Sequence, residues 1–283
     1  MTARRFLQVN VFSADPLGGN PLAVVVDAAG LSTDRMQRLA RWTNLSETAF
    51  LLPPSSEEAD YRVRIFTPTA ELPFAGHPTL GTAHALLATG GTPRTPGRLV
   101  QECGAGAVAL RDDGGRWAFA GPPLVRYEPP TDEIRGRVTA ALGLTREQVL
   151  DASWVDNGPG WLGLRLDSAE TVRGVVPDYP ALGGLDVGIV GAIDGAGSGE
   201  PAFEVRAFMD TGDEDPVTGS LNASLGRWLR DLGVAPSSYV AAQGAALGRT
   251  GRIHISEDDG EIWVAGEVTT VVDGTIDLEG GER

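Results

Sequence analysis

The sequence predicts an α+β protein of two similar halves, each rich in short strands and poor in helices. Its 283 residues exceed the usual range of about 100–200 residues for one domain, so two lobes are expected. Short apolar or alternating segments bounded by Gly, Pro, Asn and Asp predict many strands. The sequence has no long succession of β-α-β units, which disfavours a Rossmann-type fold.

An internal repeat supports the prediction of two similar halves. ELPFAGHPTLGTAHALLATG, from Glu71, aligns with EDPVTGSLNASLGRWLRDLG, from Glu214, at a constant offset of 143 residues. Just upstream, YRVRIF from Tyr61 matches FEVRAF from Phe203 at an offset of 142. Each half is therefore expected to contain a strand, a turn with an acidic residue and proline, a glycine and a helix. Chance similarity between glycine-rich segments is the alternative explanation.

In the first half, a helix is predicted after the N-cap residues Ser32-Thr33-Asp34, ending near Thr43, with Met36, Leu39 and Trp42 on its apolar face. A turn is expected at 15–21. Strands are predicted at 6–12, 22–27, 47–54, 61–68, 98–111 and 116–122.

In the second half, strands are predicted at 160–168, 188–194, 202–210, 251–258 and 261–278, and helices near 133–144, 147–152 and 221–231. The proline-rich segment PPLVRYEPPTDE predicts a linker, with a boundary near 121–132. We therefore expect an N-terminal lobe of residues 1–125, joined by a C-terminal strand of about 270–283. The C-terminal lobe is expected to span residues 130–268.

Composition and charge exclude several classes of function. A formal net charge of −15 disfavours nucleic-acid binding, which needs a basic surface. One cysteine, Cys103, leaves no intrachain disulfide, so a cytoplasmic protein is expected. The N-terminal region lacks the apolar stretch of a signal peptide, and the longest apolar run, at 21–26, is too short to span a bilayer. We therefore expect neither export nor membrane insertion.

Metal and cofactor motifs are also missing from the sequence. The three histidines His77, His84 and His254 show no HExxH spacing, and the single cysteine forms no cluster, so no metal site is expected. GxGxxG, GxxxxGK[ST] and a G-x-S-x-G serine motif do not occur. No nucleotide cofactor and no esterase triad are predicted, and His84 is expected to pack or to face solvent.

The two helix starts of the repeat are candidate anion sites. Gly76 precedes His77 and Pro78 in one half, and Gly219 precedes Ser220 in the other. The unpaired N–H groups of a first helical turn, with the positive end of the helix dipole, can hold a carboxylate without a cationic side chain. Two ordinary helix starts are the alternative.

Two acidic residues are candidates for proton transfer or substrate binding. Glu47 lies between the end of a helix and an apolar strand, where burial would raise the pKa of its carboxyl toward neutrality. A surface glutamate at the start of a strand is the alternative. Asp215 lies before Pro216, where a turn residue or helix cap is the alternative to a functional group.

Five segments in order resemble the PhzF-like family of phenazine biosynthesis. They are GNPLAVV from Gly19, NLSET from Asn44, RIFTPTAELPFAGHPTLGTA from Arg64, EDPVTGS from Glu214 and GRIHI from Gly251. Together they span nearly the whole chain. The resemblance implies the diaminopimelate-epimerase-like fold: two pseudo-symmetric lobes, each a mostly antiparallel sheet or barrel around a central helix, with the active site between them.

The resemblance also implies the site residues. The expected catalytic residues are Glu47 as proton shuttle, with His77 and Asp215, and the expected substrate-binding residues are Gly76, His77, Gly219 and Ser220. Family members need no metal or organic cofactor and are usually homodimers. Related epimerases on this fold use two cysteines, which this chain cannot supply.

The expected function is a cofactor-independent isomerase or epimerase that moves a proton on a small carboxylate in a biosynthetic process. Trans-2,3-dihydro-3-hydroxyanthranilate, or a related intermediate, is the implied substrate. The alternative is a catalytically silent small-molecule-binding or scaffold protein of the same fold. Leu221 and Asn222 depart from the family's alanines, and Trp42 and Trp161 are bulky residues near segments expected to border the site.

Overall fold

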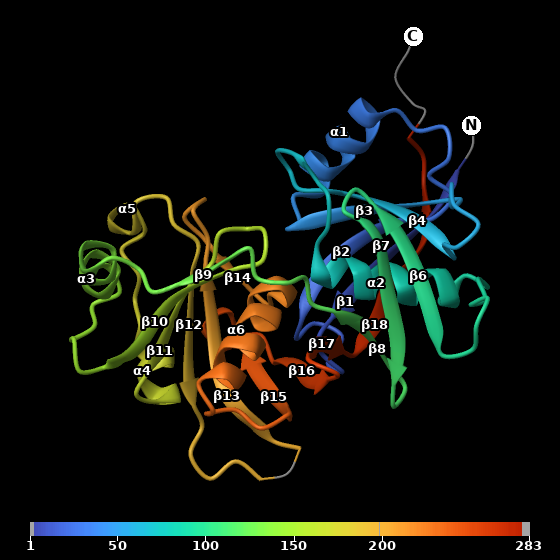
Figure 1. Cartoon of the computed structure of the whole chain (residues 1–283). Coiled ribbons are helices and arrows are strands. Elements are labelled where there is room, and N and C mark those ends of the chain that lie inside the picture. The colour runs from blue at the N-terminus through green and yellow to red at the C-terminus, as the bar shows by residue number, and fades with distance from the viewer. Residues whose placement is uncertain (1–2, 198, 279–283) are drawn as a thin grey trace. The chain divides into compact units, whose positions relative to one another are not determined.

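The computed structural model describes residues 3–197 and 199–278, and these fall into two compact units (Figure 1). The first unit comprises the described residues up to Ala120 together with those from Ala265 onward. The second unit is Gly121–Val264.

The first unit contains two helices and a mostly antiparallel sheet. Strand β2 runs parallel to β3, and β4 runs parallel to β6, whereas β18–β1, β1–β2, β3–β4, β4–β5, β6–β7 and β7–β8 are antiparallel pairs. Its elements are β1 (Arg4–Val11), β2 (Asn20–Val25), α1 (Thr33–Thr43), β3 (Glu47–Leu52), β4 (Tyr61–Phe66), β5 (Glu71–Leu72), α2 (Gly76–Ala88), β6 (Arg98–Cys103), β7 (Gly106–Asp113), β8 (Arg116–Ala120) and β18 (Val268–Ile276).

Helix α2 is the central helix of the first unit. Nine of its thirteen residues are buried, and it contacts β1, β2, β3, β8 and β18. Apart from His77 and His84, its sequence GHPTLGTAHALLA consists of small or apolar residues, which is the composition of a helix surrounded by protein. Close packing needs a glycine at position 81, where a Cβ would lie 2.5 Å from the Leu22 side chain. Figure 1 shows α2 against the strands of its sheet.

The second unit repeats this topology. Strand β11 runs parallel to β12 and β13 runs parallel to β15, whereas β9–β10, β10–β11, β12–β13, β13–β14 and β15–β16 are antiparallel pairs. Its elements are β9 (Arg126–Glu128), α3 (Asp132–Ala141), β10 (Val149–Asp156), β11 (Leu162–Leu166), α4 (Ala169–Gly174), α5 (Tyr179–Leu182), β12 (Val187–Ala192), β13 (Pro201–Phe208), β14 (Glu214–Asp215), α6 (Gly219–Asp231), β15 (Ser238–Gln243), the short 3₁₀ helix η1 (Ala245–Leu247), β16 (Gly251–Asp258) and β17 (Glu261–Gly266), whose last two residues belong to the first unit.

Helix α6 corresponds to α2 in this repeat. It follows the short strand β14 as α2 follows β5, and nine of its thirteen residues are buried. The predicted fold class is thus confirmed: an α+β protein of two similar lobes, each a mostly antiparallel sheet around a central helix. Of the sheet and barrel forms that the sequence left open, the described residues form sheets that are not closed.

The repeat extends to individual side-chain interactions. Arg64 on β4 pairs with Glu71 on β5 at 2.7 Å, and its guanidinium lies 5.1 Å from the Phe66 ring centroid. In the second unit, Arg206 pairs with Glu214 at 2.7 Å and lies 4.9 Å from the ring of Phe208. An acidic residue therefore ties each short strand to the strand beside it, directly before the central helix.

Several local predictions are wrong. Residues 147–152, predicted as a helix, mostly lie in β10, and the predicted linker contains β9. The predicted strand at 261–278 is two strands, β17 and β18, and the predictions omitted α4, α5 and β15. Of the C-terminal strand predicted at about 270–283, residues 279–283 lie outside the described residues. Trp42, predicted on the apolar face of α1, is 78% exposed.

Candidate active site

Glu47 is the first residue of β3, immediately after the α1–β3 turn. Helix α1 ends at Asn44, whose φ of 54° places it in the left-handed region and redirects the chain. The hydroxyls of Thr43 and Thr48 lie 2.8 Å apart and join the end of the helix to the start of the strand. Parallel pairing with β2 places Glu47 opposite Leu22. The Glu47 side chain, 15% exposed, is thereby held at the edge of the core.

His77 lies in the first turn of α2 and faces Glu47. Its side chain is 5% exposed, and its Nε2 lies 3.4 Å from Glu47 Oε2. Burial lowers the pKa of His77 to about 3, so the imidazole is neutral near pH 7. The contact is therefore between a carboxyl group and a neutral imidazole, without an ion pair, and it is longer than an ordinary hydrogen bond.

The central helices differ from the other α-helices in how they begin. Side chains of Ser32, Thr131, Ser168 and Asp178 cap α1, α3, α4 and α5, respectively. No side chain among the described residues caps α2 or α6. Their first-turn N–H groups are thus left to other partners, and the positive end of each helix dipole favours an anion there.

Asp215 lies at the end of β14 and is bonded to the cap position of α6. The hydroxyl of Thr218 donates to Asp215 Oδ2 over 2.5 Å, so it does not cap the helix. Gln243 is 1% exposed and donates to the Thr218 hydroxyl at 2.9 Å and to the Asp215 carbonyl at 3.1 Å. This buried amide fixes the turn between β14 and α6.

Gln101 lies at the equivalent position in the first unit. Its amide donates to the Thr79 hydroxyl of α2 at 3.0 Å, and at the matching position of α6 the Asn222 amide donates to Gln243 Oε1 at 2.8 Å. Neither glutamine was predicted from the sequence as a site residue. Their spacing of 142 residues, the offset already found for the strands, is the signal that would have identified them.

Ser220 follows Gly219 at the start of α6 and is half-buried. Its Oγ accepts from Trp161 Nε1 at 3.1 Å, and its carbonyl accepts from Asn157 Nδ2 at 3.0 Å. The sequence singled out Trp161 for its bulk alone, and Asn157 was missed.

The predicted site residues thus lie in two groups, one in each unit. In the first unit Glu47 faces His77, which follows Gly76 in α2. In the second unit Asp215, Gly219 and Ser220 surround the start of α6.

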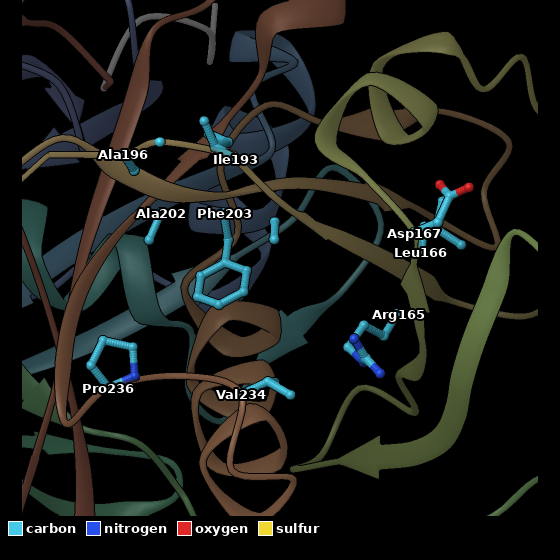
Figure 2. Close-up of a pocket in the computed structure, with 11 residues that line it drawn as sticks. Arg165, Leu166, Asp167, Ile193, Ala196, Ala202, Phe203, Val234 and Pro236 are labelled. Atoms are coloured by element: carbon cyan, nitrogen blue, oxygen red, sulfur yellow. The ribbon is translucent and has the colours of Figure 1, made fainter.

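A cavity of about 370 Å³ lies elsewhere in the second unit (Figure 2). Arg165, Phe203, Val234 and Pro236 contribute to its lining, and none of the predicted site residues does. Arg165 already pairs with Asp151 at 2.5 Å. Arg165 is the one cationic residue among the described residues that line this cavity, and its charge is already neutralised. The cavity is therefore a weaker candidate for binding an anionic substrate than the two helix starts.

The described residues show neither a metal cluster nor a membrane-spanning helix. Across 3–197 and 199–278, no group of three or more His, Cys, Asp and Glu side chains is arranged to hold a metal ion. Within the same ranges, no helix has both the length and the apolar character needed to cross a membrane.

The fold and the candidate site define a two-unit α+β protein of the diaminopimelate-epimerase-like class. A family model described as phenazine biosynthesis-like protein matches residues 9–274. The chain therefore belongs to the phenazine biosynthesis-like, or PhzF-like, family of isomerases.

Individual relatives agree with this family. Trans-2,3-dihydro-3-hydroxyanthranilate isomerase of Pseudomonas aeruginosa is 36% identical, over 94% of this chain and 95% of the relative. Antisense-enhancing sequence 1 of Schizosaccharomyces pombe is 34% identical, over 97% and 99%. A phenazine biosynthesis protein of the PhzF family from Enterococcus faecalis has a solved structure similar to this chain, with a TM-score of 0.80, 26% identity and coverage of 98% and 100%.

Proposed function

We propose that this chain is a cofactor-independent isomerase in which Glu47 moves a proton on a small carboxylate substrate. The observation that carries the proposal is the pairing of the largely buried Glu47 carboxyl with a neutral His77, 3.4 Å away, at the uncapped start of α2. A carboxyl in a water-poor position, beside N–H groups that can hold an anion, suits removal and return of a proton.

The other site residues take binding roles. Neutral His77 offers the substrate a hydrogen bond without a charge, and Asp215 orients a polar group of the substrate. Gly76 with the first-turn N–H groups of α2, and Gly219 and Ser220 with those of α6, are the substrate-binding groups that we propose for each unit. Thr218 and Gln243 support this assignment, because they hold Asp215 and leave α6 uncapped.

The substrate we propose is trans-2,3-dihydro-3-hydroxyanthranilate or a related biosynthetic intermediate. The name of the Pseudomonas aeruginosa relative, 36% identical, supports this choice. On this substrate Glu47 would take a proton from carbon and return it across the conjugated system, and the resulting enol would become a ketone. We propose that the protein is cytoplasmic and that it forms a homodimer. The single cysteine supports the cytoplasmic location, and the family resemblance supports the homodimer.

Turnover by Glu47→Gln tests the proposal. This variant keeps the size of the side chain and removes its acid/base function. With trans-2,3-dihydro-3-hydroxyanthranilate followed by NMR, we expect kcat to fall by about 100–10,000-fold. Glu57→Gln, at an exposed glutamate of the same unit, is the control and should keep wild-type turnover.

Two outcomes would count against the proposal. Glu47→Gln turning over within a few-fold of wild type would remove Glu47 from the chemistry. A wild-type protein that binds the compound without converting it would favour the alternative, a catalytically silent binding protein.

A further inference from the structure

The hydroxyl of Ser220 is held by the indole of a buried tryptophan. Trp161 Nε1 donates to Ser220 Oγ at 3.1 Å. Trp161 is 1% exposed, so its N–H cannot exchange this partner for water, whereas Ser220 is only half-buried. The bond therefore links the interior of the second unit to an accessible group in the first turn of α6.

This bond determines what Ser220 can offer to a ligand. An indole only donates, so Trp161 permanently occupies one acceptor position of the Ser220 oxygen. A serine hydroxyl has one proton to donate, and no side chain in the described part of the chain accepts that of Ser220. Ser220 is thus prepared to act as a hydrogen-bond donor to a ligand.

The turn between β10 and β11 is rigid enough to place Trp161. Asp156 Oδ1 accepts from the N–H groups of Gly158 at 2.6 Å and Gly160 at 2.8 Å. These glycines have φ values of 137° and 96°, which other residues rarely adopt, so the chain can fold tightly around the carboxylate. Trp161 follows directly, and its carbonyl accepts from Val155 N at 3.0 Å.

The same turn also holds the backbone of Ser220. Asn157 Nδ2 donates to the Ser220 carbonyl at 3.0 Å, and Asn157 is 8% exposed. Its Oδ1 has no hydrogen-bond partner among the described residues. A polar side chain more than nine-tenths buried, with one unused acceptor, thus lies beside an uncapped helix start. One turn therefore controls both the main chain and the hydroxyl of Ser220.

We propose that Trp161 is a positioning residue that directs the Ser220 hydroxyl toward the carboxylate of the substrate. This inference rests on the proposed function and deepens it, because it explains how the α6 start selects an acceptor-only group. A carboxylate accepts from both the hydroxyl and the first-turn N–H groups of α6, whereas a ligand group that only donates must compete with Trp161 for the Ser220 oxygen.

Binding of two probes to Trp161→Phe tests the inference. The probes are 3-hydroxyanthranilate, the aromatic analogue of the proposed substrate, and 2-aminophenol, which is the same molecule without its carboxylate. Loss of one neutral hydrogen bond predicts about 3–10-fold weaker binding of 3-hydroxyanthranilate by calorimetry, and 2-aminophenol binding unchanged within two-fold. Turnover should show the loss in KM, with kcat close to wild type.

The matched control is Trp154→Phe in the same unit. Trp154 is 6% exposed, and its Nε1 has no hydrogen-bond partner among the described residues. This substitution removes an indole N–H without breaking a bond, so binding of both probes should stay at the wild-type level. Ser220→Ala completes a double-mutant cycle, in which Trp161→Phe should add no further loss.

NMR gives a readout that does not need Trp161→Phe to fold. Titrating 3-hydroxyanthranilate into wild type should shift the indole N–H resonance of Trp161, and Ser220→Ala should abolish that shift. Failure of wild type to bind 3-hydroxyanthranilate would overturn the substrate class, and this inference with it. Binding that Ser220→Ala weakens but Trp161→Phe does not, or an equal loss for 2-aminophenol, would overturn the role of Trp161 alone.

Discussion

The buried imidazole of His77 makes the stability of the first unit depend on pH. Burial lowers the pKa of His77 to about 3, whereas a histidine in an unfolded chain has a pKa of about 6.5. Between these values the unfolded state binds a proton that the folded state does not, so stability is lost as the pH falls below about 6.5. At pH 5, about 1.5 units below that value, the loss is about 2 kcal/mol.

His77→Gln removes this titration and should flatten the dependence. We expect wild type to lose about 2 kcal/mol more than the variant between pH 7 and pH 5, in urea unfolding followed by circular dichroism. Other titrating groups are common to both proteins and cancel in the comparison. Hydrogen exchange of the α2 amides should report the same difference within the first unit.

His84→Gln is the control, because His84 lies on the same helix and is only partly buried. Burial lowers its pKa as well, so its removal should change the pH dependence in the same direction but by less. Equal pH dependence in wild type and His77→Gln, or an imidazole resonance of His77 that titrates near pH 6.5, would refute the reasoning.

The remaining predictions concern stability. Burial raises the pKa of Asp186 to about 6, so its carboxyl contributes stability that is lost as the pH rises from 4 to 7, and the stability change of wild type over this range should be less favourable than that of Asp186→Asn, in urea unfolding at both values. Glu214→Gln leaves a buried arginine unpaired and should destabilise by about 3–5 kcal/mol, whereas Glu71→Gln, in the more exposed equivalent pair, should cost about 1 kcal/mol or less. Gly81→Ala should destabilise the protein by about 1–3 kcal/mol, because the new Cβ meets packed side chains. Gly136→Ala in α3 meets no neighbouring atoms and should stabilise the protein by about 0.5–1 kcal/mol. Similar thermal unfolding midpoints for the two variants would contradict this prediction.

The repeat could be predicted because its matched residues perform the same structural task twice. Arg64 and Arg206 each form an ion pair with a glutamate of the following short strand. The arginine and the glutamate are therefore identical in the two halves of the repeat. The family motifs likewise coincide with the segments that begin and surround α2 and α6. The two similar lobes and their central helices could therefore be predicted from the sequence.

Local errors arose where tertiary pairing overrides propensity. Residues 149–152 include the helix formers Leu150 and Ala152, but pairing with β11 places this segment in a strand. In α1, Met36, Leu39 and Ala40 face the core. Trp42 lies about 120° around the helix from Met36, at about 100° per residue, and so faces solvent.

Side-chain contacts between segments far apart in the chain could not be predicted from the sequence. Glu47 meets His77 only because β3 pairs with β2 and α2 packs on both strands. Trp161 and Ser220 lie 59 residues apart, and a glycine-rich turn brings them together. Such contacts depend on packing geometry, which composition and spacing do not encode.

Carbon-bound deuterium tests the central claim, proton transfer by Glu47, most directly. Wild type and Glu47→Gln are incubated in D₂O with trans-2,3-dihydro-3-hydroxyanthranilate, and label at the carbons of the ring is followed by NMR. The account predicts that wild type fixes deuterium at carbon, while Glu47→Gln fixes about 100-fold less in the same time. Labelling by Glu47→Gln within a few-fold of wild type would contradict it.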